Sequence, residues 1–159
     1  MKTVCCLPAF VFAVVVAIVP TVGQQDATRP DFSGTWKLNI KKSDFPNKSL
    51  LANETMVITC SGSIVEMRHA IDGHEIVQTY TADGQPRTAK EAAQIETKAF
   101  WEKSTLIIEK QTLNVPNSRS TVMTSRWTIS KDGRTLKSDV STSPLLSFRL
   151  SFRYVYDKQ

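Results

Sequence analysis

The chain contains one stretch that decides its fold, at residues 31 to 39: Asp31-Phe32-Ser33-Gly34-Thr35-Trp36-Lys37-Leu38-Asn39. Trp36, Leu38 and Ile40 alternate with Lys37 and Asn39, and this period of two predicts a strand with one apolar face. A glycine in a strand lets the backbone pass close to a bulky neighbour. We therefore predict a strand over residues 34–40 whose tryptophan plugs a solid core or floors a ligand cavity.

The same period of two continues along the chain and predicts further strands. The nine predicted strands cover residues 34–40, 54–60, 64–71, 74–82, 94–100, 105–112, 121–130, 135–141 and 146–157. Turn-forming pairs stand at Ser61-Gly62, Asp72-Gly73 and Asp132-Gly133. Pairs of this kind are typical of short hairpins, so neighbouring strands are expected to run antiparallel.

One-sided strands joined by hairpins can form an up-and-down barrel or a two-sheet sandwich. A barrel leaves no free sheet edge, and the first and last predicted strands suit each other as closing neighbours. Only two long connections occur, residues 41–53, with room for one helical turn, and residues 83–93, a short helix or an irregular arm. We predict an all-β, antiparallel up-and-down barrel of about eight to ten strands, with a two-sheet β-sandwich as the alternative.

Residues 1–23 have the pattern of a cleaved signal peptide, with Lys2, an apolar run over residues 7–19, and small residues at Thr21 and Gly23. The apolar run is shorter than the roughly 20 residues that a membrane-spanning helix needs. We therefore expect an exported protein, periplasmic or secreted, with no stable membrane anchor. Residues 24–159 then form a single domain.

The net charge of +5 is spread among interspersed acids and bases, which argues against a nucleic-acid partner. The predicted mature chain keeps one cysteine, Cys60, so no internal disulfide can form. Separately, we expect the protein to be a monomer. His69 and His74 flank one turn, but a metal site usually needs three or four ligands. His69 shares a strand face with apolar residues and is expected inside. We predict no metal, no cofactor and no catalytic residue. The protein is therefore not expected to be an enzyme; the third alternative is an enzyme with His69 as its acid–base residue.

The sequence resembles the lipocalin-like exported proteins of bacteria, a mostly uncharacterised part of the calycin group of ligand-binding barrels. The matching stretches are Phe32-Ser33-Gly34-Thr35-Trp36-Lys37-Leu38-Asn39, Lys42-Ser43-Asp44-Phe45, Tyr80-Thr81-Ala82-Asp83-Gly84, Arg126-Trp127-Thr128-Ile129-Ser130-Lys131-Asp132-Gly133-Arg134-Thr135-Leu136 and Tyr154-Val155-Tyr156-Asp157-Lys158-Gln159. In lipocalins an arginine near the end of the last strand packs over the tryptophan of the Gly-x-Trp motif. Alternation places Arg153 on the outer face, and Lys158 is the other candidate for this role.

The leading interpretation is an exported, non-enzymatic barrel that binds a small hydrophobic or amphipathic molecule. Gly34 and Trp36 form the predicted barrel-closing motif. The candidate cavity-lining residues are Trp36, Leu38, Met56, Ile58, Met67, His69, Trp101, Met123, Trp127, Phe148, Phe152 and Tyr154. The alternative is a filled barrel that acts through protein contacts, as an inhibitor or an envelope partner, because its two long connections are polar.

Overall fold

The computed structural model describes residues 29–51, 53–88, 95–113, 121–143 and 150–159. Ten strands and one 3-10 helix make up the regular structure of these residues. In chain order they are β1 (Gly34–Leu38), η1 (Lys48–Leu51), β2 (Thr55–Ser61), β3 (Ile64–Ile71), β4 (His74–Thr81), β5 (Arg87–Thr88), β6 (Ile95–Glu102), β7 (Thr105–Thr112), β8 (Val122–Ile129), β9 (Thr135–Thr142) and β10 (Ser151–Lys158).

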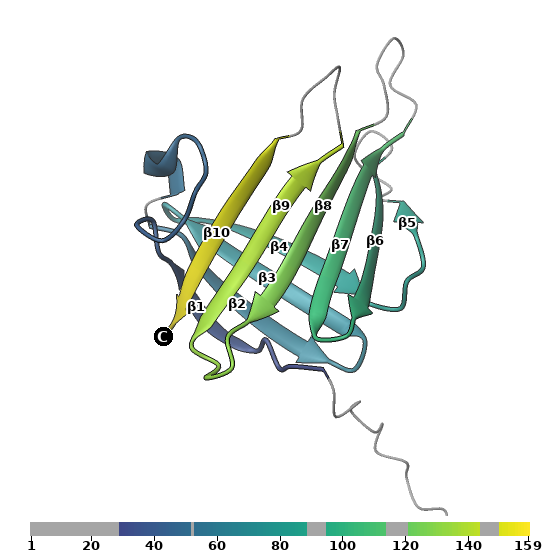
Figure 1. Ribbon diagram of the computed structural model, residues 1–159, viewed down its shortest axis with the longest axis horizontal. Coiled ribbons are helices and arrows are strands. Elements are labelled where there is room, and N and C mark those ends of the chain that lie inside the picture. The colour runs from purple at the N-terminus through teal and green to yellow at the C-terminus, as the bar shows by residue number, and fades with distance from the viewer. Residues whose placement is uncertain (1–28, 52, 89–94, 114–120, 144–149) are drawn as a thin grey trace, which may run out of the picture.

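All ten strands belong to one antiparallel sheet with the order β4-β3-β2-β1-β10-β9-β8-β7-β6-β5. The predicted all-β up-and-down architecture is confirmed, and the first and last strands pair, with Trp36 opposite Lys158. The sheet curls into a half-barrel in which β1 to β4 lie behind β6 to β10 (Figure 1). The sheet nevertheless has two edge strands, β4 and β5. The predicted pairing of the first and last strands therefore forms, but it does not remove every free edge, as the barrel prediction required. Just beyond β4, the Gly84 amide donates to the Ala99 carbonyl of β6 at 2.8 Å.

The connections differ in detail from the predictions. The loop over residues 41–53 does contain one helical turn, η1. Part of the 83–93 connection forms β5, which alternation could not indicate because the strand has only two residues. Residues 89–94 lie outside the described residues. The last strand begins at Ser151 rather than at the predicted residue 146, and residues 146–149 also lie outside the described residues.

One hairpin shows directly why the turn residues matter. Asp72 and Gly73 both adopt positive φ angles, 47° and 82°. A two-residue hairpin needs this geometry because it matches the twist of the strands it joins. It holds β3 and β4 in a register that places Ile71 opposite His74.

The core is closed at the end where β1 begins, which we call the closed end. Trp36 is 0% exposed, and its Nε1 donates to the Phe32 carbonyl at 2.9 Å. The Phe32 ring also contacts the Trp101 ring, with centroids 5.3 Å apart. Fully buried Leu106 and Leu136 complete the packing. Trp36 therefore plugs the closed end.

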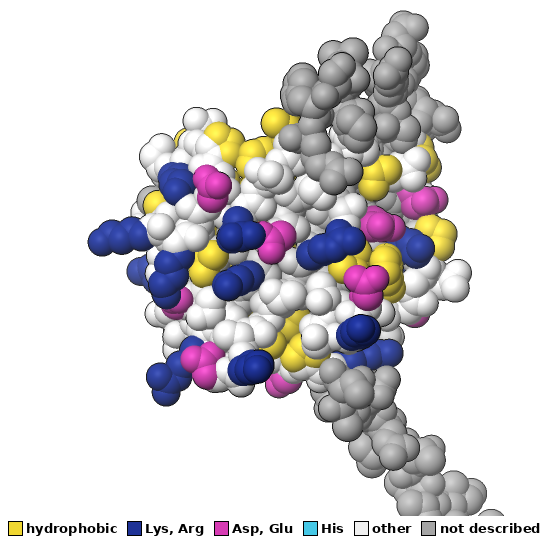
Figure 2. Space-filling view, in the orientation of Figure 1, with side chains coloured by type: hydrophobic (Ala, Val, Ile, Leu, Met, Phe, Trp, Pro, Cys, Tyr) yellow, Lys and Arg dark blue, Asp and Glu magenta, His cyan; other side chains and the backbone are white. Residues whose placement is uncertain are grey.

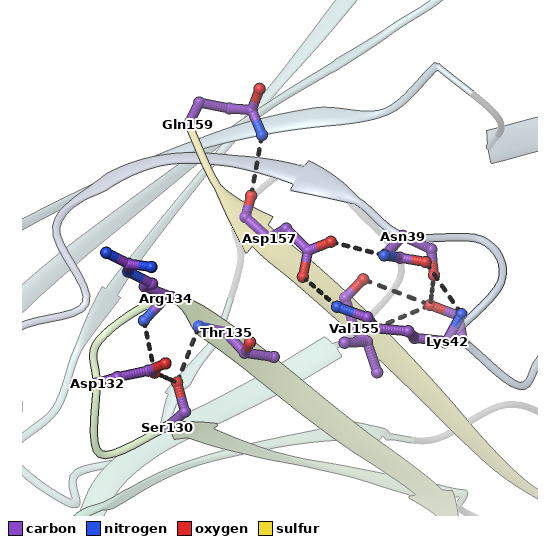
Figure 3. Close-up of polar contacts among 10 residues, drawn as sticks. Asn39, Lys42, Ser130, Asp132, Arg134, Thr135, Val155, Asp157 and Gln159 are labelled. Carbon is purple, nitrogen blue, oxygen red and sulfur yellow. Dashed lines mark hydrogen bonds and ion pairs between the residues drawn. The ribbon is translucent and has the colours of Figure 1, made fainter.

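The loop after β1 is tied to the outside of β10 by polar contacts (Figure 3). Asp157 accepts from the Asn39 side-chain amide at 2.6 Å and from Lys42 Nζ at 2.9 Å. The Ser43 hydroxyl accepts from the Val155 amide at 2.9 Å, so Val155 is buried although it lies on the outer face. These contacts connect the loop to the strand that closes on β1.

The outer face of β6 to β10 is polar and mixed in charge. Figure 2 shows Lys and Arg side chains interspersed with Asp and Glu over β6 to β10. Arg153, for example, donates to Asp139 at 2.7 Å on this face. The large apolar side chains are therefore mostly turned to the inside of the curled sheet.

Candidate ligand-binding interior

The inward face changes character from the closed end to the opposite end, which we call the far end. At the closed end the inward residues Trp36, Ile58 and Leu136 are almost fully buried. Toward the far end the inward residues Met123 and Phe152 are only half-buried. The inward side chains are therefore fully buried at the closed end and partly exposed at the far end.

Eleven of the twelve predicted cavity-lining residues fall on inward strand faces, and Phe148 lies outside the described residues. The buried ones are Trp36, Leu38, Met56, Ile58, Met67 and Trp127. The half-buried ones are His69, Trp101, Met123, Phe152 and Tyr154. The half-buried members are the ones whose surfaces are free to touch a guest.

A carboxylate on the inward face was not expected from the sequence. Glu54 is 3% exposed, and its Oε1 lies 2.7 Å from Nδ1 of His69 and accepts from the Tyr156 hydroxyl at 3.2 Å. Glu54 stands two residues before Met56, so strict alternation along β2 could have identified it as inward. A buried carboxylate needs such partners, because an unpaired one is strongly destabilising.

The carboxylate of Glu54 influences the neighbouring phenols. Burial raises the pKa of Tyr156 well above its ordinary value, and the charge of Glu54 and its hydrogen bond raise it further. Burial and, secondarily, Glu54 also raise the pKa of Tyr154. Both groups therefore remain neutral donors, and negative charge is disfavoured around them.

Lys110 brings a cation to the inward face of β7. It alternates with the buried, inward Leu106 and Ile108, and its Nζ lies 5.4 Å from the centre of the Tyr80 ring. Burial lowers the pKa of Lys110. The Tyr80 hydroxyl in turn donates to the Gln78 side chain at 2.6 Å. The sequence reasoning missed Lys110 because a lone lysine in a strand usually faces water.

Two buried polar atoms on the inward face lack a hydrogen-bond partner within the described part of the chain: Nε1 of Trp127 and Oγ of Ser138. Trp127 is 8% exposed and Ser138 is 1% exposed. The two residues lie directly opposite each other on β8 and β9, and Ser138 is also opposite Tyr154 on β10. Buried polar groups are nearly always hydrogen-bonded, so this pair needs an explanation.

The other candidate residues, His74 and Cys60, do not form a site with the groups described above. His74 is exposed and lies opposite Ile71, in the pair next to His69–Ile76 on the same face of the hairpin. Cys60 is half-buried, and burial raises the pKa of its thiol. The described residues contain no group of three or more His, Cys, Asp or Glu side chains that could hold a metal ion. In the same residues, no helix has the length and apolar character needed to span a membrane.

The chain is similar in fold to several solved structures. No family model and no curated protein matches the chain. Lipid binding protein 8 of Caenorhabditis elegans aligns with a TM-score of 0.57 at 14% identity, over 80% of this chain and 95% of that one. Secretory abundant heat soluble protein 4 of Ramazzottius varieornatus gives a TM-score of 0.57 at 13% identity, over 80% of this chain and 94% of that one.

A third structure, the REP1-NXSQ fatty acid transporter, aligns with a TM-score of 0.53 at 13% identity, over 81% of this chain and 96% of that one. At these identities the likeness concerns the fold alone. The chain has a lipocalin-like, antiparallel β-barrel fold.

Proposed function

We propose that this protein binds one small hydrophobic or amphipathic molecule inside its barrel, without transforming it. The observation that carries the proposal is the half-buried inward surface formed by Met123 and Phe152 at the far end and continued by Tyr154 toward Ser138. Apolar side chains of this size gain roughly 25 cal/mol for each Å² removed from water. A guest that covers these side chains would be stabilised by this free energy, because the protein's own packing leaves them partly exposed.

The nature of the structural neighbours supports the same proposal. One neighbour is a lipid binding protein and another is a fatty acid transporter by name. The fold is therefore one that can hold apolar guests, and barrels of this size can hold one small ligand. The identity of the guest does not follow from them, because only the fold is shared.

The experiment is a titration of the protein, produced from the full chain, with the neutral apolar fluorophore N-phenyl-1-naphthylamine. Saturable binding of one probe per chain is expected. Met123→Glu should abolish it by placing a charge on the inward face, whereas Thr124→Glu, the next residue on the opposite face of β8, should not. Absence of saturable binding, or equal losses in the two variants, would refute the proposal.

We also propose that the protein is exported after removal of residues 1–23. The support is the order of a basic start, an apolar run and small residues. Intact-mass measurement of the product from a secreting bacterial host tests this. The expected product begins at Gln24, and a product that retains Met1 in the cytoplasm would refute export.

A further inference from the structure

Trp127 and Ser138 together form an unsatisfied hydrogen-bonding pair inside the barrel. The indole can only donate, and the hydroxyl can donate or accept. Neither atom has a partner in the described part of the chain, although both residues are more than nine-tenths buried. A guest that places an acceptor oxygen over the inward face of β8 and β9, where Trp127 and Ser138 are opposite each other, would give a partner to both the indole and the hydroxyl.

The pair lies two residues along the strands from Ser125 on β8 and Val140 on β9, which are opposite each other on the inward face. On β8 the inward residues, counted from the far end, are Met123, Ser125 and Trp127. Met123 and Trp127 are four residues apart, which is about 13 Å along a strand. Ser125 and Val140 are both half-buried. A slender molecule entering from the far end would therefore meet the unsatisfied pair with its leading end.

The surroundings of the pair select against an anion. The Trp127 ring stacks on Tyr156 with centroids 6.2 Å apart, and the Tyr156 hydroxyl donates to the buried Glu54. Burial first, and then the charge of Glu54, raise the pKa values of Tyr154 and Tyr156, so both low polarity and a buried carboxylate oppose negative charge near the two rings. The inward cation, Lys110, lies instead at the level of Met123, opposite it across β7 and β8.

We propose that the guest is a neutral amphipathic molecule whose leading end carries an acceptor oxygen, such as a ketone, ester or alcohol, bonded by Trp127 Nε1 and Ser138 Oγ. This inference rests on the proposed function and specifies the chemical class of the guest. An anionic amphiphile with its headgroup at Lys110 is the competing outcome.

The test uses three eleven-carbon probes, 2-undecanone, undecane and undecanoate, each displacing the neutral fluorophore. The ketone should lose about three- to tenfold in affinity in Trp127→Phe and in Ser138→Ala, as expected for one lost hydrogen bond. Undecane should bind equally well to the variants and to the unaltered protein. Ser141→Ala, on the outer face of β9, is the matched control and should leave all three affinities unchanged.

A second readout does not depend on any variant. The indole N–H resonance of Trp127 in a ¹⁵N-labelled sample should move downfield when the ketone binds, and should not move with undecane. The Trp36 indole already donates to Phe32, so its resonance serves as the internal control. This measurement remains decisive if Trp127→Phe fails to fold.

The outcomes separate the two proposals. If the fluorophore itself does not bind saturably, the proposed function fails. If it binds but none of the three probes displaces it, the assignment of a slender amphipathic guest fails and the proposed function stands. If undecane and the ketone bind but the Trp127 resonance is unmoved and Ser138→Ala has no effect, only the assignment of a neutral oxygen fails. Tighter binding of undecanoate than of the ketone, lost in Lys110→Met, would overturn the assignment in favour of an anionic guest.

Discussion

The ammonium of Lys158 lies 5.3 Å from the centre of the Trp36 ring, across the pair of strands that joins the two ends of the chain. The resemblance to lipocalins implies a cation over this tryptophan, and Lys158 rather than Arg153 supplies it. Arg153 faces outward and pairs with Asp139. The contact closes the barrel end with a plug, a neighbouring cation and a glycine that leaves room for both.

Gly34→Ala should destabilise the protein strongly. Gly34 has a φ of +141°, which side-chain-bearing residues rarely adopt, and an added Cβ would lie 2.9 Å from Cε of Lys158. Backbone strain of this kind costs about 1–3 kcal/mol. We expect the free energy of unfolding, measured by urea denaturation, to fall by an amount in that range. Gly62→Ala is the control for backbone strain alone, because Gly62 also has a positive φ, +59°, but nothing lies within 4 Å of its added Cβ. A smaller loss for Gly34→Ala than for Gly62→Ala would contradict the role of Gly34.

Lys158→Gln should lower the free energy of unfolding by about 0.5 kcal/mol, the usual size of an exposed cation–π contact. Lys158→Arg should preserve the stability, since arginine offers the same charge to the ring. Thermal and urea unfolding of the three proteins measure the difference. Equal stability of the glutamine and lysine forms would show that the contact contributes nothing.

Glu54→Ala should destabilise the protein by about 2–3 kcal/mol, because it leaves the Tyr156 hydroxyl and His69 without their buried acceptor. Glu54→Gln keeps an acceptor oxygen and should lose less. Glu66→Gln is the control, since Glu66 pairs with Arg68 on the solvent side and such pairs contribute little. Similar losses for Glu54→Ala and Glu66→Gln, measured in urea, would contradict the buried cluster.

Stability should fall as the pH rises above about 10, the ordinary pKa of tyrosine. Burial raises the pKa values of Tyr80 and Tyr156 well above this value, so the native protein retains protons that the unfolded chain loses. Unfolding then releases protons, and its free energy decreases with pH between the unfolded and native pKa values. Melting temperatures from pH 8 to 11 test this, and Tyr80→Phe should show a shallower decline. A flat profile would contradict the burial of both phenols.

The sequence predicts the fold well because its strands are one-sided. Trp36, Met56 and Trp127 all appear at inward positions of an alternating pattern, and the structure places them there. The pairing of the first and last strands also follows from the need to cover sheet edges. By contrast, β5 is too short to show any period, and the free edges at β4 and β5 depend on curvature that no local pattern encodes.

The polar interior is harder to predict, because it depends on contacts between residues far apart in the chain. Glu54 and Tyr156 are 102 positions apart and meet only when β1 and β10 pair. Lys110 reaches the Tyr80 ring only because the sheet curls. The missing partners of Trp127 and Ser138 are a property of packed volume, which alternation cannot reveal.

Isotope-filtered NMR of the protein saturated with N-phenyl-1-naphthylamine reports the protein protons that lie close to the probe, and so shows directly whether a guest binds inside the barrel. We expect nuclear Overhauser contacts from the probe to the inward side chains of Met123 and Phe152. Contacts confined to Val57 and Val77, which are exposed on the outer face of β2 and β4, would contradict binding inside the barrel.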